Sequence, residues 1–361
     1  MKIGIIGDTH LGNKRFYEES FLHLERALNI LEKENCDVIL HTGDMFDTKD
    51  ITLQTLHRTF LIFNKIKKQK VIAICGNHEK RAKDEINAVK LLSDIGCFEY
   101  LHNKVLHIDD FSFLAMSHVN EADAQAELDN IIKQRLPEMR EKKVLMIHQN
   151  IKDYSPGDGI ELKYLKSLGF FLIVNGHIHK RIYDWPVILP GSLLATSINE
   201  DEAKPRGVTV IDTNNCIPKF IEIEQRPIVI KQVHFNDATK EEIINTIKEI
   251  YKEEKQKNEG AIIKLILKGS TKNAIVDFFN IMSFKDLFLD MDIKKADLKE
   301  AVSLWKEQYQ EAKLKMDDDN ALIKILEGKV EKPEQKLKML YDYNAEQIAE
   351  IYLKESDDIN E

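Results

Sequence analysis

The stretch Gly43-Asp44-Met45-Phe46-Asp47 follows the apolar run Val38-Ile39-Leu40 and delivers acidic side chains where that run ends. Four other apolar runs before residue 180 stop in the same way, at a turn that carries His, Asp or Asn. These turns are Asp8-Thr9-His10, Asn77-His78, His148 and His177-Ile178-His179. We interpret Asp44 as the centre of this set, a carboxylate that bridges two metal ions.

Apolar runs and helical patterns alternate along the first half of the chain. The runs at 3–6, 38–40, 71–75, 144–147 and 171–174 predict strands, and the patterns near 21–31, 53–67, 84–96 and 122–135 predict helices. Such alternation indicates an α/β fold with a largely parallel sheet that is covered on both faces. Ligands gather at the carboxyl ends of the strands in these folds, so we expect the five polar turns to converge.

Each polar turn alone is weak evidence for a site. Gly-Asp and Gly-Asn are ordinary turn pairs, and an isolated histidine is more often structural. All five strand ends together favour a functional site over chance placement. The other histidines lack this context, and we interpret them as structural: 23, 41, 57, 102, 107, 118 and 234.

The pattern changes after residue 180. A turn at Pro190-Gly191-Ser192 and strands at 208–211 and 220–223 are expected to close the first domain with antiparallel strands. Strands at 228–233, 261–267 and 287–291 then alternate with helices at 240–255 and 273–282, a βαβαβ pattern. We predict a first domain at 1–226, a cap domain at 227–295 and a helical segment at 296–361.

Composition restricts the function. The 52 basic and 61 acidic residues give a net charge of −9, which argues against coating nucleic acid by bulk charge. The four cysteines are isolated, which favours a reducing compartment. Neither a signal peptide nor an 18-residue apolar run is evident, so we expect a soluble cytoplasmic protein.

The polar turns offer carboxylate, imidazole and amide ligands without a thiolate. This set suits manganese, iron or zinc better than calcium, and we expect two Mn²⁺ ions. Two ions about 3.5–4 Å apart stabilise in-line displacement at phosphorus. His78, next to Asn77, is the expected group that faces the phosphate and acts on the leaving oxygen.

The chain resembles the calcineurin-like metallophosphoesterases in its polar motifs. These motifs are Asp8-x-His10, Gly43-Asp44-x-x-Asp47, Gly76-Asn77-His78-Glu79, His148 and Gly176-His177-x-His179. Within this family the chain resembles the Mre-eleven/SbcD nuclease subunits of double-strand-break repair complexes. The resemblance implies a four-layered αββα sandwich with a DNA-contacting cap. It further implies one metal held by Asp8, His10, Asp44 and His179, and a second held by Asp44, Asn77, His148 and His177.

The resemblance also implies partners. Family members form homodimers through helices that would include Leu56, Phe60, Val89 and Leu92, although these residues also suit an ordinary core. They bind an SMC-like ABC ATPase through C-terminal helices, which the apolar stripe between 337 and 352 would supply. DNA-backbone contacts are expected, with solvated surface side chains as the alternative, at Lys80, Arg81, Lys180, Arg181 and Arg206.

One position departs from the family. Asp47 stands where cellular members usually have a histidine with a part in 3′–5′ exonuclease chemistry, and an ionised Asp is a poor proton donor. The residues around Asp47 and Arg206 resemble the recombination nucleases of large tailed phages, which would place the protein in a host cytoplasm. We expect a Mn²⁺-dependent DNA nuclease, an exonuclease and endonuclease by resemblance, that hydrolyses phosphodiester bonds at or near DNA ends. Two other functions stay open, a small-molecule phosphodiesterase or phosphatase on the same scaffold and a non-catalytic DNA tether for the ATPase.

Overall fold

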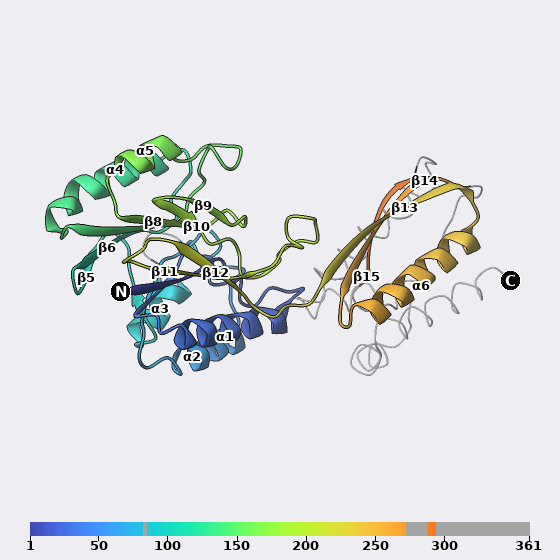
Figure 1. The fold of residues 1–361 in the computed structure, drawn as a ribbon, viewed down its shortest axis with the longest axis horizontal. Coiled ribbons are helices and arrows are strands. Elements are labelled where there is room, and N and C mark those ends of the chain that lie inside the picture. The colour runs from blue at the N-terminus through green and yellow to red at the C-terminus, as the bar shows by residue number, and fades with distance from the viewer. Residues whose placement is uncertain (82–84, 272–286, 294–361) are drawn as a thin grey trace, which may run out of the picture. The chain divides into compact units, whose positions relative to one another are not determined.

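The computed structural model describes residues 1–81, 85–271 and 287–293. The chain divides into two compact units between Gln225 and Arg226 (Figure 1).

Two six-stranded mixed sheets form the first unit. The first sheet has the order β12-β11-β1-β2-β3-β4, with β1 to β4 parallel and β11 and β12 antiparallel to their neighbours. Its strands are β1 (Lys2–Ile6), β2 (Val38–His41), β3 (Lys70–Ala73), β4 (Glu99–Tyr100), β11 (Gly207–Asp212) and β12 (Pro218–Glu222).

The second sheet has the order β5-β6-β7-β8-β10-β9, with the four strands from β6 to β10 parallel and the two edge strands antiparallel. Its strands are β5 (Val105–Ile108), β6 (Phe111–Met116), β7 (Lys142–Ile147), β8 (Leu172–Asn175), β9 (Ile182–Asp184) and β10 (Val187–Leu189).

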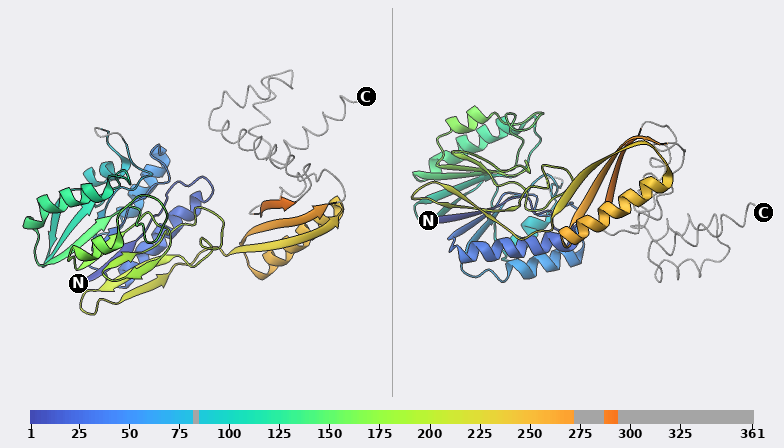
Figure 2. Two further views of the ribbon diagram at one scale, coloured as in Figure 1. Left: turned by 90° about the horizontal axis from the view of Figure 1, so that it is seen from above. Right: turned by 45° about the vertical axis from the view of Figure 1, so that its right-hand side comes forward.

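Helices cover the outer face of each sheet, as the two sides of the first unit in Figures 1 and 2 show. The first sheet carries α1 (Tyr17–Lys33), α2 (Leu53–Phe63) and α3 (Ala88–Asp94), and the second carries α4 (Ala124–Arg135) and α5 (Leu162–Ser167), with a short 3₁₀ turn at Leu136–Glu138.

The alternation of side chains along β1 explains the layers. Ile3 and Ile5 are fully buried against the second sheet, whereas Ile6 faces the helices. Gly4 also faces that side, where a Cβ atom would lie 2.8 Å from a methyl carbon of Leu31 on α1. The chain therefore has two sheets packed face to face where its strand pattern alone predicted one, because a continuous apolar strand does not reveal whether its second face meets a helix or another sheet.

The predicted helices are confirmed with shifted ends. Helix α1 buries the stripe Phe21, Leu24, Leu28 and Leu31, whose spacing fits one helical face. Helix α2 begins after Thr52, whose hydroxyl accepts a hydrogen bond from the backbone N–H of Thr55. It ends at Phe63, short of the predicted 67.

The second unit contains a three-stranded parallel sheet of β13 (Ile228–Ala238), β14 (Ile262–Thr271) and β15 (Leu287–Ile293), with α6 (Lys240–Lys257) between the first two strands. Thr239 and Glu242 form a reciprocal capping box at the start of α6. The sheet packs on Ile243 and Ile247 of this helix. The helix predicted at 273–282 and the predicted segment 296–361 lie outside the described residues.

Two of the residues expected at a dimer contact belong to the core. Val89 and Leu92 of α3 are 0% exposed and pack under the first sheet, so they cannot meet a second copy. Leu56 and Phe60 are partly buried against the same core. In the described part of the chain, no helix is both long and apolar enough to cross a membrane.

Candidate metal centre

The five predicted strand ends meet at one place between the two sheets. Strands β1, β2 and β3 are parallel neighbours in the first sheet, and β7 and β8 are parallel neighbours in the second, so their carboxyl ends lie together. The structure brings together all seven side chains predicted as metal ligands, with His78 and Asp47 beside them.

One group of nitrogens defines the first metal position. Nε2 of His10 lies 3.2 Å from Nε2 of His179, although the two residues are 169 positions apart. Two nitrogens that each lie about 2.1 Å from one ion in tetrahedral or octahedral geometry are separated by about 3.0–3.4 Å. The spacing therefore suits two ligands of the same ion better than a hydrogen bond.

The amide oxygen of Asn77 defines the second position. It lies 3.1 Å from Nε2 of His148 and 2.9 Å from Nδ1 of His177. Oδ2 of Asp44 lies 3.3 Å from the same His148 nitrogen. Asp44, His148 and His177 can thus hold one cation together.

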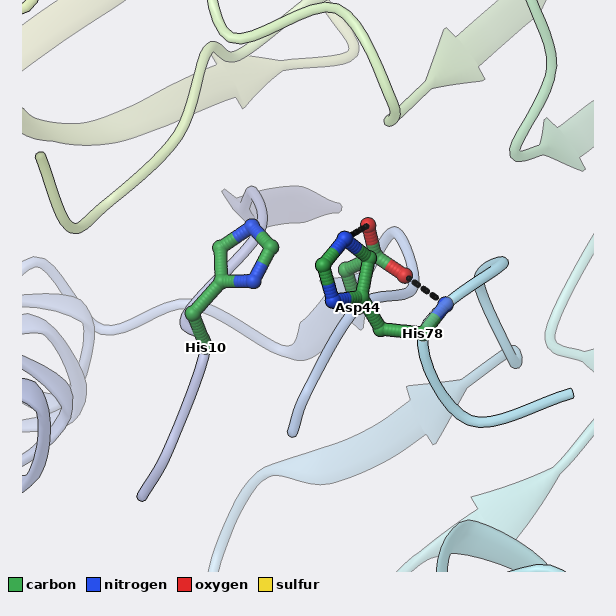
Figure 3. A group of neighbouring side chains, drawn as sticks. All are labelled: His10, Asp44 and His78. Carbon is green, nitrogen blue, oxygen red and sulfur yellow. Dashed lines mark hydrogen bonds and ion pairs between the residues drawn. The ribbon is translucent and has the colours of Figure 1, made fainter. Parts of the chain in front are cut away.

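Asp44 stands between these two groups. Its Oδ1 accepts a hydrogen bond of 3.0 Å from the backbone N–H of His78, and its Oδ2 lies 4.0 Å from the Nε2 atom of His78 (Figure 3). The ring of His10 lies against the ring of His78 with the centroids 4.8 Å apart. His10, Asp44 and His78 lie close enough together to hold a cation, as Asp44, His148 and His177 do. Asp44 therefore belongs to both of these sets of three residues.

The backbone at the strand ends is shaped for close approach. His10, Asp44 and His177 have left-handed φ values of 45°, 47° and 70°, which are uncommon for residues other than glycine and cluster at functional sites. A Cβ atom on Gly43 would lie 2.4 Å from Nδ1 of His148, and one on Gly176 would lie 2.3 Å from the carbonyl oxygen of Thr42. The motif glycines therefore let the two sheets meet around the site.

The charges of the buried centre call for a cation. Burial alone would lower the pKa of His148, but the carboxylates of Asp44 and Asp8 outweigh it and raise this pKa to about 10. Burial opposes the ionisation of Asp44, yet His148 holds the pKa of Asp44 below its usual value. Oδ2 of Asp8 is buried and has no hydrogen-bond partner in the described residues, as expected for an atom that binds a metal ion. The donor set and this orphaned oxygen fit divalent cations.

Glu79 connects the turn that carries Asp44 with the turn that carries Asn77 through hydrogen bonds to the backbone of both. Its carboxylate accepts hydrogen bonds from the backbone N–H groups of Phe46 at 2.6 Å and Gly76 at 2.7 Å. Burial, together with the charge of Asp44, raises the pKa of Glu79 to about 8. Glu79 thus fixes the spacing of two ligand turns without entering the centre.

Asp47 lies behind His10. Its Oδ1 is 3.4 Å from Nδ1 of His10 and accepts a hydrogen bond of 2.9 Å from Asn13, while its backbone oxygen is 2.6 Å from Nδ1 of His78. Burial opposes ionisation, but the adjacent His10 ring and the hydrogen bond from Asn13 lower the pKa of Asp47. This placement suits an acceptor that orients His10 more than a proton donor to substrate.

Three residues near the centre were not selected from the sequence. Glu202 lies 3.3 Å from Nδ1 of His179, and Glu121 lies 3.5 Å from Nε2 of His177. His118, which we interpreted as structural, stacks on His177 with centroids 5.9 Å apart and forms a possible cation-binding group with Glu121 and His177. His118 follows the end of β6 by two residues, but β6 was not among the strands predicted from the sequence, so the strand-end rule was not applied there. Glu121 and Glu202 lie in turns further from a strand end.

The predicted DNA contacts differ in their surroundings. Arg206 is only 5% exposed and forms an ion pair of 2.6 Å with Glu202, which contradicts its expected place at an accessible DNA surface. Arg181 lies over the ring of Phe220, and Arg81 pairs with Asp50 and Glu85. A cavity of about 700 Å³ opens beside His177 and His179, and Lys180, Arg181, Lys204 and Arg206 are among the residues that line it.

Comparison with known proteins agrees with this geometry. Residues 1–181 match the family model of the calcineurin-like phosphoesterases, and the chain belongs to this family. The fold and the His/Asp centre thus define a metallophosphoesterase.

The chain is also distantly related to proteins described as "DNA double-strand break repair protein Mre11". The protein from Sulfolobus acidocaldarius is 25% identical over 284 residues, which cover 71% of this chain and 73% of that protein. The one from Saccharolobus solfataricus is 24% identical and the match covers 82% and 83% of the two chains. The one from Methanocaldococcus jannaschii is 26% identical with coverage of 82% and 87%.

Proposed function

We propose that this protein is a metal-dependent DNA nuclease that hydrolyses phosphodiester bonds at or near DNA ends. The observation that carries the proposal is the convergence of the seven ligand side chains from five strand ends, in a chain whose relatives over most of its length are described as DNA double-strand break repair proteins. Family membership alone would fit any phosphoester substrate.

The proposed ligand sets follow the two groups in the centre. Asp8, His10, Asp44 and His179 would hold one divalent ion, Mn²⁺ by preference, and Asp44, Asn77, His148 and His177 would hold the other. When bound, such a pair of ions polarises the phosphoryl oxygens and lowers the pKa of a water molecule.

The chain's own residues supply orientation and a proton. Nδ1 of His78 lies 2.6 Å from the backbone oxygen of Asp47, which orients the ring, and its Nε2 lies on the Asp44 side of the centre (Figure 3). We assign to His78 the role of stabilising charge on the phosphate and donating a proton to the leaving oxygen. Asp47 contributes through His10 and through its own backbone oxygen.

The proposal includes partners. Residues 227–295 would contact DNA as a cap, and 296–361 would bind an SMC-like ABC ATPase. A homodimer would use the outer sides of α2 and α3, where exposed apolar side chains occur at Leu53, Leu61, Leu91 and Ile95, rather than the buried Val89 and Leu92. Sequence-independent DNA-backbone contacts would fall to Lys80, Arg81, Lys180 and Arg181, with weaker binding at high salt.

The test is the digestion of end-labelled duplex and hairpin DNA by the full chain in Mn²⁺, with and without the co-expressed ATPase. We expect cleavage that stops when the metal is chelated. Faster turnover of a bis-nitrophenyl phosphate ester with no attack on DNA would indicate a small-molecule phosphodiesterase instead. DNA binding without cleavage under every condition would indicate a tether. Asp47→His in the same assay then measures what the departure from the cellular motif does to 3′ exonuclease rate.

A further inference from the structure

Two carboxylates stand outside the proposed ligand sets, one behind each of the histidines at the end of β8. Glu202 faces Nδ1 of His179 at 3.3 Å, on the side of the ring away from His10. Glu121 faces Nε2 of His177 at 3.5 Å, on the side away from Asn77. In both rings one nitrogen faces the proposed metal position and the other faces a carboxylate.

Glu202 is held in place by a buried arginine and a backbone N–H group. Its Oε2 accepts hydrogen bonds from Arg206 at 2.6 Å and from the backbone N–H of Thr196 at 3.2 Å, so that Oε1 is left for His179. Arg206 also donates to the carbonyl oxygen of Ser192 at 3.1 Å. These contacts fix the carboxylate before any metal binds.

Glu121 is held by one backbone group. The N–H of Asn150, two residues after His148, lies 3.1 and 3.0 Å from its two oxygens. Its side chain is 25% exposed, against 10% for Glu202. His118 covers the His177 ring from one side, with the ring planes at 27° to each other.

We propose that Glu202 and Glu121 are positioning residues that set the metal affinity of the two positions separately, Glu202 through His179 and Glu121 through His177. A carboxylate that accepts the outer N–H of a ligating histidine fixes its tautomer and its direction and makes the inner nitrogen a better ligand. This role rests on the proposed dimetal centre, and it adds two residues that act on the metal without touching it.

The first experiment titrates the full-length metal-free chain with Mn²⁺ and counts bound ions from the electron paramagnetic resonance of the free ion. We expect two ions in the wild type. Glu121→Ala should weaken one of them by roughly 10- to 100-fold, the usual effect of losing such a partner. Asp123→Ala, an exposed neighbour whose side chain makes no cap hydrogen bond, is the matched control and should change nothing.

Glu202 is tested with a double variant and a conservative variant. Glu202→Ala leaves Arg206 buried without its partner, so Glu202→Ala/Arg206→Met removes the stranded charge as well. Glu202→Gln, which keeps an acceptor for His179, should bind the ions nearly as the wild type does. Glu200→Ala, at an exposed position two residues away, is the control.

The positions are then separated in an Asn77→Ala background, where only the ion of the first position is expected to stay. Glu202→Ala/Arg206→Met should weaken that remaining ion, and Glu121→Ala should leave it unchanged. If Glu121→Ala weakens the binding of that remaining ion equally, the separate positioning roles are wrong. They are also wrong if the wild type binds two ions and neither the Glu121 nor the Glu202 substitutions change its titration curve. The dimetal centre stands in both cases.

Two further outcomes are decisive. A wild type that binds fewer than two ions overturns the dimetal centre and the positioning roles together. A third wild-type ion that disappears in Glu121→Ala would make Glu121 a ligand, with His118 and His177, and would overturn its positioning role.

Discussion

The two sheets contribute different chemistry to the same centre. Among the proposed ligands, the ends of β1, β2 and β3 bring two carboxylates, the amide oxygen and one imidazole, whereas the ends of β7 and β8 bring three imidazoles and no acid. Each proposed metal position takes ligands from both sheets. The first sheet supplies the negative charge that attracts a cation, and the second sheet supplies the remaining neutral ligands. Metal binding and the packing of the two sheets should therefore depend on each other.

The largest effect is expected for Asp44, the one ligand shared by both positions. Asp44→Ala should remove both ions and lower DNA cleavage by at least about 10³-fold, the upper range for loss of one group that acts on the transition state. Metal content measured by elemental analysis, together with the cleavage rate, checks this. His78→Ala is the matched control and should lose cleavage but keep both ions. Two retained ions in Asp44→Ala would contradict the bridging role.

A buried ion pair between Arg206 and Glu202 lies behind His179. Arg206→Ala leaves Glu202 buried without its cation and should lower the free energy of unfolding by about 3–5 kcal/mol. Urea unfolding of the metal-free protein measures the loss. Lys204→Ala, whose partner Asp201 is exposed, should change stability by less than about 1 kcal/mol. An Arg206→Ala value as small as that of Lys204→Ala would show that the His179 side needs no such support.

Metal removal tests whether the folded chain, with its two sheets packed together, is stabilised by the ions. An ion present at 100 times its dissociation constant stabilises the folded state by about 2.7 kcal/mol. Chelation should therefore lower the melting temperature of the wild type, with the shift dependent on the Mn²⁺ concentration. Asn77→Ala should retain only part of this shift, because one position keeps its ligands. A melting temperature that does not respond to metal would contradict binding of the ions by the folded chain.

The smallest expected effect concerns His23 on α1, whose Nδ1 lies 3.2 Å from the carbonyl oxygen of Leu193. Burial lowers the pKa of His23 below its ordinary value near 6.5. The unfolded chain therefore binds a proton that the folded chain resists, and stability should fall as the pH drops below about 6.5 towards the lower folded pKa. Comparing urea unfolding of wild type and His23→Gln at several pH values isolates this contribution. A parallel pH dependence in the two proteins would assign the effect to other groups.

The sequence was sufficient for much of the fold. The strand and helix pattern located most of the secondary structure around the centre, because apolar runs and a buried helical stripe are local signals. It was not sufficient for the division into two sheets, nor for α5, which is a short helix. The fold class beyond an α/β pattern came from the motif resemblance.

The candidate site also has residues that local sequence signals predict and residues that they do not. The turns that carry the proposed ligands were found because strand ends are readable in sequence. Glu121 and Glu202 stand 56 and 23 positions from the histidines that they face and carry no local signal. Arg206 was misplaced for a related reason. A lone arginine in a Pro-Arg-Gly turn is expected to be a surface cation, and only the fold shows that the Glu202 carboxylate and three backbone carbonyl groups enclose it.

The central place of β1 in the first sheet has a consequence for biosynthesis. The strand pairs with β11 on one side, and the backbone oxygen of Asp8 accepts hydrogen bonds from the N–H of Leu193 and the hydroxyl of Ser192. These partners are made roughly 185 to 205 residues after Asp8. At the usual elongation rate of about 5–20 residues per second, the N-terminal strand waits on the order of 10–40 s at the ribosome for them. During that time one edge of β1 is open to other unpaired strands, so the nascent chain is exposed to mispairing along this strand.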